Sequence, residues 1–256
     1  MNPTPQPIVV GILTPSTPDA EVGAMLQDAL RLTVAGASII ELDTTPGGPF
    51  HGDDGILLGM LVLGLTDLDL TVCVRTTDAR VAGLAIDRGA AWIADPSGST
   101  SDPEIARVVA AGGARCIIGP WPAPGEPRRR GTEDEIYAEG LVRNIARLLD
   151  AGVRSDRIVV DAGAGARRDD AEPWRMLNHI ERLRSLGYPL IVDGSDLILD
   201  VISPDGATDE QLDDAAIAIT ILASGAKAWG IRTARVSRVG AALQRIFEPT
   251  TARISQ

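Results

Sequence analysis

The chain has 256 residues, 45% of them hydrophobic and 23% charged, and this composition excludes a disordered, fibrous or coiled-coil protein. Its formal net charge of −11 at pH 7 argues against binding to nucleic acid or to an anionic membrane, because both require an excess of Lys and Arg. No apolar run reaches the roughly 18 residues that a membrane-spanning helix needs, and no secretory leader opens the chain. We therefore expect a cytoplasmic protein without nucleic-acid or membrane partners.

Short β-branched runs alternate with longer amphipathic stretches along the whole chain. Each run is apolar on both faces, which is typical of parallel strands covered by helices. The runs predict strands over Ile8–Leu13, Ser38–Leu42, Asp69–Val74, Ala91–Ala94, Arg115–Ile118, Arg157–Val160, Pro189–Val192 and Lys227–Ile231. The amphipathic stretches predict helices over Ala20–Ala35, Asp78–Arg88, Asp102–Ala111, Glu133–Ala151, Pro173–Leu186 and Asp209–Ala223.

One more helix is predicted over Ile56–Leu65, and its sequence is apolar nearly all round. This pattern is typical of a helix that is buried on every side. The outward face of such a helix is covered either by a partner subunit or by the core of the same chain, and the sequence leaves both alternatives open.

Eight strands that alternate with helices predict an α/β protein, a (β/α)8 TIM barrel with a single domain over residues 1–256. A doubly wound parallel sheet is the alternative. It usually has fewer strands and a glycine-rich first turn, whereas no G-x-G-x-x-G motif lies between Leu13 and Asp19. The sequence therefore favours the barrel.

In such a barrel the chemistry lies where the strands run into the loops that follow them. Six of the eight residues just past the predicted strands are charged, namely Asp43, Arg75, Asp95, Asp161, Asp193 and Arg232. Together they predict a polar mouth at one end of the barrel. Its charged side chains bind a polar ligand, bind a metal or pair with one another. In the alternative interpretation, the Asp residues cap the following helices, but caps do not explain Arg75 and Arg232.

The strand ends also resemble a known family, the dihydropteroate synthases and related pterin-binding barrels. Gly36–Gly47 is similar to the motif G-A-D-I-I-D…S-T-R-P-G, and Arg157–Gly165 is similar to R-I-I-L-D-P-G-I-G. Further matching segments, in chain order, are Val10–Asp19, Gly89–Gly98, Tyr188–Ser195 and Ile231-Arg232. The resemblance spans the chain and implies the same barrel, assembled as a homodimer.

The resemblance implies a chemistry as well. In the family, the amine of p-aminobenzoate attacks an electrophilic pterin, and Mg²⁺ and basic side chains hold the diphosphate leaving group. Acidic side chains and a lysine bind the pterin. The positions of this chain that match the family's motifs are Thr17, Asp19, Asp95, Asp161, Ser195 and Arg232.

Other family positions are altered. Arg75 stands where the family has an Asp, which inverts the charge, while Asp43 and Asp193 are acids where the family has small residues. The single lysine, Lys227, opens the eighth strand and so cannot replace the pterin-binding lysine after the seventh. Each lost hydrogen bond to a buried ligand costs about 1–3 kcal/mol. We therefore do not expect dihydropteroate synthesis.

Two functional hypotheses follow. The first is an altered transferase-type enzyme that forms a C–N or related bond on a different small polar ligand. Its catalytic residues would be Asp161, Asp95, Arg232 and Arg75, its substrate-binding residues Asp43, Asp193, Ser195, Asp19 and Thr17, and its one suggested cofactor Mg²⁺. The alternative is a non-catalytic paralogue that binds a ligand or a partner protein. An Arg75 that pairs with Asp43 or Asp95 and fills the mouth would favour this alternative, and an open mouth with converging acids would favour the enzyme.

Overall fold

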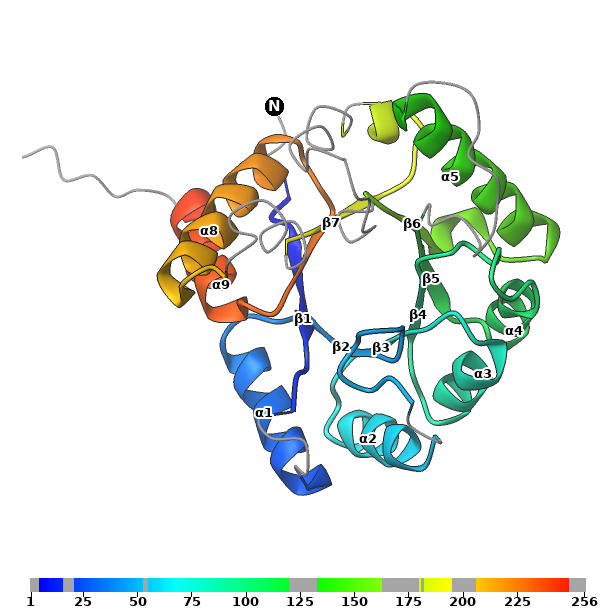
Figure 1. Cartoon of the computed structure of the whole chain (residues 1–256), viewed down its shortest axis with the longest axis horizontal. Helices are drawn as coiled ribbons and strands as arrows, with labels where there is room; N and C mark the ends of the chain where they lie inside the picture. The colour runs from blue at the N-terminus through cyan, green and yellow to red at the C-terminus, as the bar shows by residue number, and fades with distance from the viewer. Residues whose placement is uncertain are drawn as a thin grey trace, which may run out of the picture.

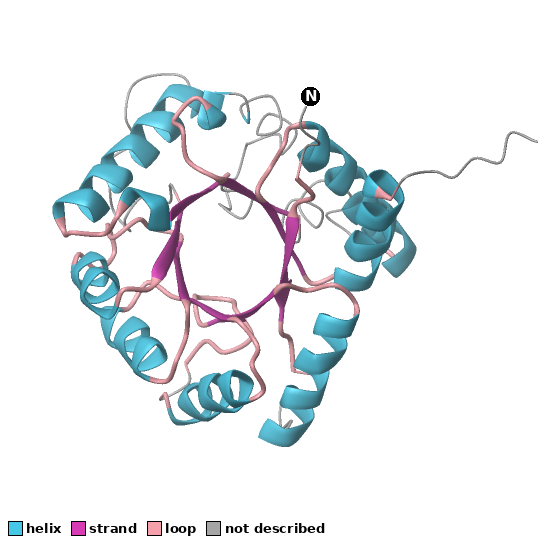
Figure 2. Ribbon diagram, turned by 180° about the vertical axis from the view of Figure 1, so that it is seen from behind, coloured by secondary structure: helices cyan, strands magenta, loops and turns pink. Residues whose placement is uncertain are grey.

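Eight parallel strands close into a barrel, and helices surround it (Figures 1 and 2). The computed structural model describes residues 5–15, 21–52, 55–119, 133–162, 180, 182–194 and 206–248. The strands pair in chain order and the last returns to the first, which confirms the predicted fold class. They are β1 (Ile8–Ile12), β2 (Ile39–Asp43), β3 (Val72–Arg75), β4 (Trp92–Asp95), β5 (Arg115–Ile118), β6 (Ile158–Asp161), β7 (Leu190–Asp193) and β8 (Gly230–Thr233).

The helices follow the strands in the predicted alternation. They are α1 (Val22–Val34), α2 (Ile56–Asp67), α3 (Ala79–Asp87), α4 (Glu104–Gly112), α5 (Glu133–Asp150), α8 (Asp209–Gly225) and α9 (Val236–Phe247), with a 3-10 turn η1 (Ser155–Arg157) before β6. Most of the helix predicted over Pro173–Leu186 lies outside the described residues. The sequence analysis missed α9, although its buried Val236, Val239 and Leu243 recur at helical spacing.

Six of the eight strands extend further than predicted at their carboxyl ends, the exceptions being β1 and β5. Asp43, Arg75, Asp95, Asp161 and Asp193 are the last residues of their strands rather than the first residues of loops. Register explains the difference, because Asp43 pairs with Arg75 across β2 and β3, and Asp193 pairs with Arg232 across β7 and β8. Opposite charges on directly paired residues keep the ladder intact. The barrel backbone therefore fixes these side chains in place.

Two hydrophobic clusters fill the molecule. The larger one lies between the strands and the helices, and the smaller one packs residues from the strands with Trp229. The members of the smaller cluster include Val10, Cys73, Ile117 and Ile191. Because side chains alternate along a strand, Glu41, Arg75 and Asp193 lie two residues beyond members of this cluster, on the same faces of their strands. Charged residues therefore continue the inner apolar layers toward the carboxyl ends of the strands.

Helix α2 has one buried and one exposed apolar face. Leu58, Leu61, Val62 and Leu65 are buried in the larger cluster. On the outer face, the exposed residues include Ile56, Met60 and Leu63. Core burial therefore accounts for one face only. No helix within the described residues is long and apolar enough to span a bilayer.

Candidate functional site

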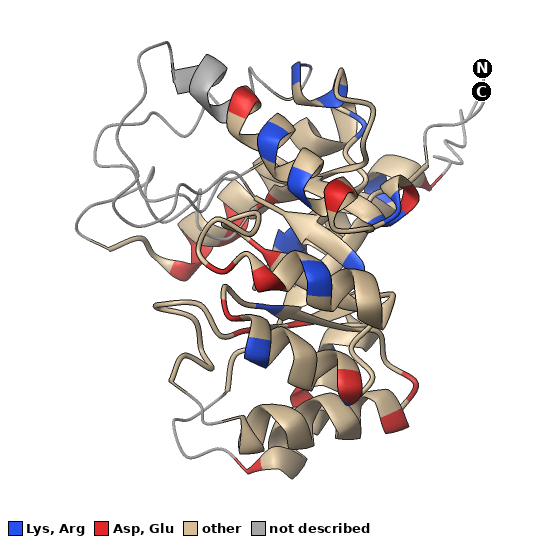
Figure 3. Cartoon of the chain, turned by 90° about the vertical axis from the view of Figure 1, so that its right-hand side faces the viewer, with Lys and Arg blue, Asp and Glu red and all other residues tan. Residues whose placement is uncertain are grey.

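Six charged residues from five strands meet inside the barrel at the carboxyl ends of the strands. We call them the mouth network, and they are Glu41, Asp43, Arg75, Asp161, Asp193 and Arg232. Figure 3 shows acidic and basic positions side by side on the strands in the middle of the molecule. All six residues are buried, with none more than 8% exposed. Burial at this level makes each ion pair structurally important, because an unpaired charge here would be costly.

Arg232 of β8 is the centre of the network and is completely buried. Its Nε donates a hydrogen bond to Glu41 Oε2 at 3.0 Å, and its Nη1 bonds Asp161 and, at 3.3 Å, Asp193 Oδ2. Its Nη2 donates no hydrogen bond to any described residue. Three carboxylates thus surround one guanidinium, and one of its nitrogens is left for a further acceptor.

Arg75 of β3 lies between two of the acids. Its Nη1 is 3.5 Å from Asp43 Oδ2 and 3.7 Å from Asp193 Oδ2. Asp43 is held in turn by Thr45, whose backbone N–H and hydroxyl donate to Asp43 Oδ1 at 2.9 and 2.6 Å. Asp193 therefore bridges the two arginines, and the internal pair between Arg75 and Asp43 is present.

The electrostatics of the network favour charged arginines. Burial lowers the pKa of Arg232, but Glu41, Asp161 and Asp193 more than offset it and hold that pKa well above its usual range. Burial raises the pKa of Glu41, although Arg232 and Arg75 oppose the shift. Four carboxylates against two guanidiniums leave the network with a formal charge of −2. The raised pKa of Glu41 favours the uptake of a proton by this carboxylate.

Asp95 lies apart from this network. Its Oδ1 accepts from the backbone and hydroxyl of Ser97 at 2.9 and 2.7 Å, and its Oδ2 accepts from the backbone N–H of Ser99 at 2.6 Å. Burial raises the pKa of Asp95, and these hydrogen bonds oppose the rise. Within the described residues Asp95 has no ion pair with an arginine. Its contacts are those of a side chain that organises the loop after β4.

The structure thus brings together five of the residues predicted from the sequence, namely Asp43, Arg75, Asp161, Asp193 and Arg232. Thr17, Asp19 and Ser195 lie outside the described residues, so their roles stay predictions. Glu41 was not predicted as a site residue. The signal was present, since a glutamate in the middle of the buried strand Ile39–Asp43 lies on the same face as Asp43.

The suggested Mg²⁺ finds no site in the described part of the chain. No three His, Cys, Asp or Glu side chains there are grouped so as to hold a metal ion. The acids of the mouth network are paired with arginine guanidinium groups. These guanidinium groups would compete with Mg²⁺ for the carboxylate oxygens.

Comparisons with known proteins agree with this fold. A family model described as "Pterin binding enzyme" matches residues 16–237. The dihydropteroate synthase of Mycobacterium leprae is 29% identical over 223 residues, which cover 81% of this chain and 78% of the relative. The protein named "Inactive dihydropteroate synthase 2" of the same organism is 28% identical over 258 residues, covering 91% and 86%.

Solved structures share the fold. The dihydropteroate synthase of Xanthomonas albilineans aligns with a TM-score of 0.79 at 24% identity, covering 94% of this chain and 92% of that one. The Yersinia pestis enzyme gives the same TM-score at 20% identity. The family model covers most of the chain and confirms the resemblance to the family, so the chain belongs to the family of pterin binding enzymes, as a divergent relative of the dihydropteroate synthases.

Proposed function

We propose that this chain is a non-catalytic member of its family, a barrel that binds a small polar ligand without condensing a pterin with p-aminobenzoate. The observation that carries the proposal is the position of Arg75 between Asp43 and Asp193. Arg75 is buried, and both of these acids are paired with it inside the barrel. The charge that replaces the family's Asp is therefore neutralised within the protein rather than offered to a substrate.

The same contacts account for the acids that the family lacks. The sequence analysis assigned Asp43 and Asp193 to the binding of a new substrate, because both are acids where the family has small residues. In the barrel they are the partners of Arg75, and a buried arginine without such partners would cost several kcal/mol. The three changes are thus explained as one compensated charge inversion. The relative from Mycobacterium leprae that is named inactive supports the proposal as a precedent for a family member without the reaction.

Arg232 indicates what the ligand would carry. Its Nη2 is buried and donates to no described residue, and a buried donor without an acceptor costs about 1–3 kcal/mol. A carbonyl or carboxylate oxygen of a bound molecule would accept this hydrogen bond. We therefore expect a small polar ligand that places an oxygen beside Arg232.

A second candidate is the altered transferase-type enzyme. The observation in its favour is the formal charge of −2 on the mouth network, which a cationic or amine substrate would balance. In this case Asp161 and Arg232 would contact the substrate. Product formation from a small amine would separate this candidate from the binding protein.

A turnover assay tests the proposal directly. The full chain is incubated with the pterin diphosphate, p-aminobenzoate and Mg²⁺, and dihydropteroate is measured by mass spectrometry beside an active dihydropteroate synthase. We expect no product above the rate without protein. Sustained product formation would overturn the proposal, and a new product from a panel of small amines would favour the second candidate.

A reversion variant tests the physical reason. Arg75→Asp combined with Asp43→Gly and Asp193→Gly restores the family's pattern and keeps the formal charge of the network at −2. We expect this triple variant to gain thermal stabilisation by a pterin, which the unaltered chain lacks. The matched control is Arg80→Asp with Asp67→Gly and Asp87→Gly, which makes the same change of charge at exposed positions. Pterin binding by the unaltered chain, equal to that of the triple variant, would contradict this explanation.

A further inference from the structure

Asp193 contacts both arginines of the mouth network through the same oxygen. Its Oδ2 lies 3.3 Å from Arg232 Nη1 and 3.7 Å from Arg75 Nη1. Strand β8, which carries Arg232, is the neighbour of β7 in the barrel, whereas β3, which carries Arg75, is not. Arg75 therefore reaches Asp193 across the barrel interior. One carboxylate oxygen thus lies between two guanidiniums that come from different sides of the barrel.

Strand pairing and burial fix this carboxylate in place. Asp193 is the last residue of β7 and pairs in register with Arg232. The next residue, Gly194, donates its backbone N–H to the carbonyl oxygen of Arg232 at 2.8 Å. Only 1% of the Asp193 side chain is exposed. The side chain could not turn toward water without breaking two buried ion pairs, so it stays between the guanidiniums.

The two guanidiniums repel each other, and Asp193 offsets this repulsion. Burial and the nearby Arg232 lower the pKa of Arg75, whereas Asp193, Glu41 and Asp43 raise it above its ordinary value, and Asp193 has the largest effect of the three acids. Arginine side chains bind carboxylate and phosphate oxygens of ligands through the same kind of contact. In this barrel a side chain of the protein itself supplies the anion.

A further anion would meet an unfavourable charge at this place. The mouth network has a formal charge of −2, so a ligand of charge −1 would bring the buried charge to −3. Such a charge is costly, because the burial of a charge is offset only by an opposite charge. Arg232 Nη2 is buried and donates to no described residue. The oxygen that best suits this donor is therefore one that carries no net charge, such as a carbonyl.

We propose that Asp193 is a built-in anion, which occupies an oxyanion position between Arg75 and Arg232 and thereby restricts the ligand of the mouth to uncharged or cationic molecules. This inference rests on the proposed function in one respect, because it assumes that the mouth binds a small polar ligand. Of the two oxygens that would suit Arg232, it selects the carbonyl over the carboxylate. Asp193 is then a residue that determines specificity.

Chemical rescue by formate tests the proposal. Asp193→Ala removes the carboxylate and leaves its space, and formate is a free carboxylate of that size. We expect the variant to melt at a lower temperature than the unaltered chain. Formate, added at constant ionic strength, should raise the melting temperature of the variant saturably by at least about 2 °C. The unaltered chain should show no such shift, because Asp193 fills the position.

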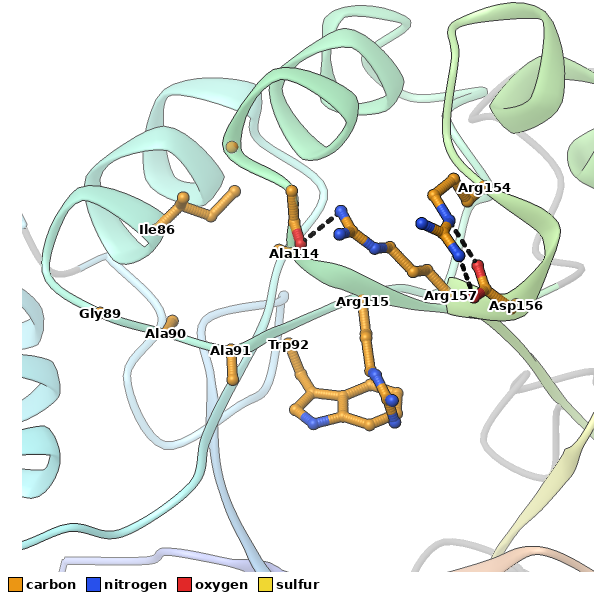
Figure 4. Close-up of a pocket in the computed structure, with 12 residues that line it drawn as sticks. Ile86, Gly89, Ala90, Ala91, Trp92, Ala114, Arg115, Arg154, Asp156 and Arg157 are labelled. Atoms are coloured by element: carbon orange, nitrogen blue, oxygen red, sulfur yellow. Dashed lines mark hydrogen bonds and ion pairs between the residues drawn. The ribbon is translucent and has the colours of Figure 1, made fainter.

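Two further variants are the controls. Asp193→Asn keeps the shape of the side chain and leaves no space, so formate should not stabilise it. Asp156→Ala removes a carboxylate that accepts hydrogen bonds of 2.9 and 2.6 Å from Arg154 (Figure 4). This pair lies just before β6, at the opposite end of the barrel from the mouth network, and its side chains are 68% and 61% exposed. Water replaces the lost partner at such a site, so formate should have no effect there.

Each contrary result would overturn the proposal. These results are stabilisation of the unaltered chain by formate, no stabilisation of a folded Asp193→Ala, and a shift in either control equal to that in Asp193→Ala. If Asp193→Ala is unfolded in buffer, circular dichroism follows its folding as formate is added, and a chain that stays unfolded would overturn the proposal too. Product formation in the turnover assay would contradict the proposed function alone, because the rescue by formate does not depend on it.

Discussion

At the scale of the residue, Arg232 is the largest fully buried side chain of the described structure. It is completely buried, and its charge is shared among Glu41, Asp161 and Asp193. The Coulombic attraction offsets the desolvation of four buried groups only while all of them are present. The stability of the barrel mouth therefore depends on this arginine, whether or not the protein catalyses a reaction.

Replacing Arg232 should accordingly unfold the chain more easily. Arg232→Met removes the cation that three buried carboxylates share, of which Asp193 also pairs with Arg75, and we expect the free energy of unfolding to fall by about 3–5 kcal/mol. Urea unfolding at pH 7 measures the change. Arg238→Met is the control, because Arg238 pairs with Asp213 but is 58% exposed, and it should cost under about 1 kcal/mol. Equal losses in the two variants would show that the mouth network adds little to stability.

The pKa of Glu41 gives a prediction of pH dependence. Burial raises this pKa in the folded state, so the folded protein binds its proton more tightly than the unfolded chain does. The stabilisation is complete below the ordinary glutamate pKa of about 4.3 and is lost as the pH rises through the raised value. Because Glu41→Gln imitates the protonated form, its stability relative to the unaltered chain should increase with pH over this window. Urea unfolding at several pH values measures it. A decrease instead would mean that Arg232 outweighs burial and lowers the pKa.

At the scale of the element, the loop after β4 depends on Asp95. Four hydrogen bonds from Ser97 and Ser99 converge on its two oxygens, and Asn144 of α5 donates to the carbonyl of Ser97 at 3.3 Å. The glycine between the serines is required, because a Cβ on Gly98 would come within 2.1 Å of the Asn144 amide nitrogen. This loop is thus locked to the neighbouring helix, and Asp95 is its central acceptor.

The sequence analysis expected Asp95 to be catalytic, and its contacts predict a different result for mutagenesis. Asp95→Ala leaves the buried N–H groups of Ser97 and Ser99 without acceptors, and we expect a loss of about 1–3 kcal/mol in stability. Thermal or urea unfolding measures it against Asp67→Ala at the exposed end of α2, which should change stability by less than about 0.5 kcal/mol. A fully stable Asp95→Ala protein with impaired ligand binding would support the catalytic role instead.

At the scale of the whole molecule, the exposed apolar face of α2 is the feature that the monomer leaves unexplained. The sequence predicted this helix for a subunit contact or for the core, and the core covers only one of its faces. The family resemblance also implies a homodimer. Of α2, the segment Ile56–Thr66 carries no charge in a chain of net charge −11, so two copies could meet there without repulsion between acids.

We therefore expect the 26.9 kDa chain to sediment as a dimer. Met60→Asp places a charge at the centre of the exposed face of α2 and should shift the protein toward the monomer in analytical ultracentrifugation. Val142→Asp, at an equally exposed apolar position of α5, is the control and should leave the dimer intact. A monomer before any substitution would refute the expectation, and a dimer insensitive to Met60→Asp would place the contact elsewhere.

Much of this molecule could be predicted from sequence, because the relevant signals are local. Runs of apolar residues and helical periodicity predicted eight strands and most of the helices, and the order of the strand-end motifs indicated the family. The charged ring was predicted for the same reason, since each of its members ends or nearly ends a strand. Helix α9 was not predicted although its apolar residues recur at helical spacing. Glu41 was not predicted as a site residue because it lies within its strand, two residues before the strand end at Asp43.

Which charges pair with which was decided only by the tertiary structure. Arg232 and Glu41 are 191 positions apart, and no local pattern relates them. Barrel closure and strand register place them together, and register also sets Asp43 opposite Arg75. Asp193 likewise meets Arg75 only across the interior of the closed barrel. The sequence by itself determined the barrel, the family and the ring of charges. The ion-pair partner of each charged residue depends on distances between strands, and only the closed barrel sets these distances.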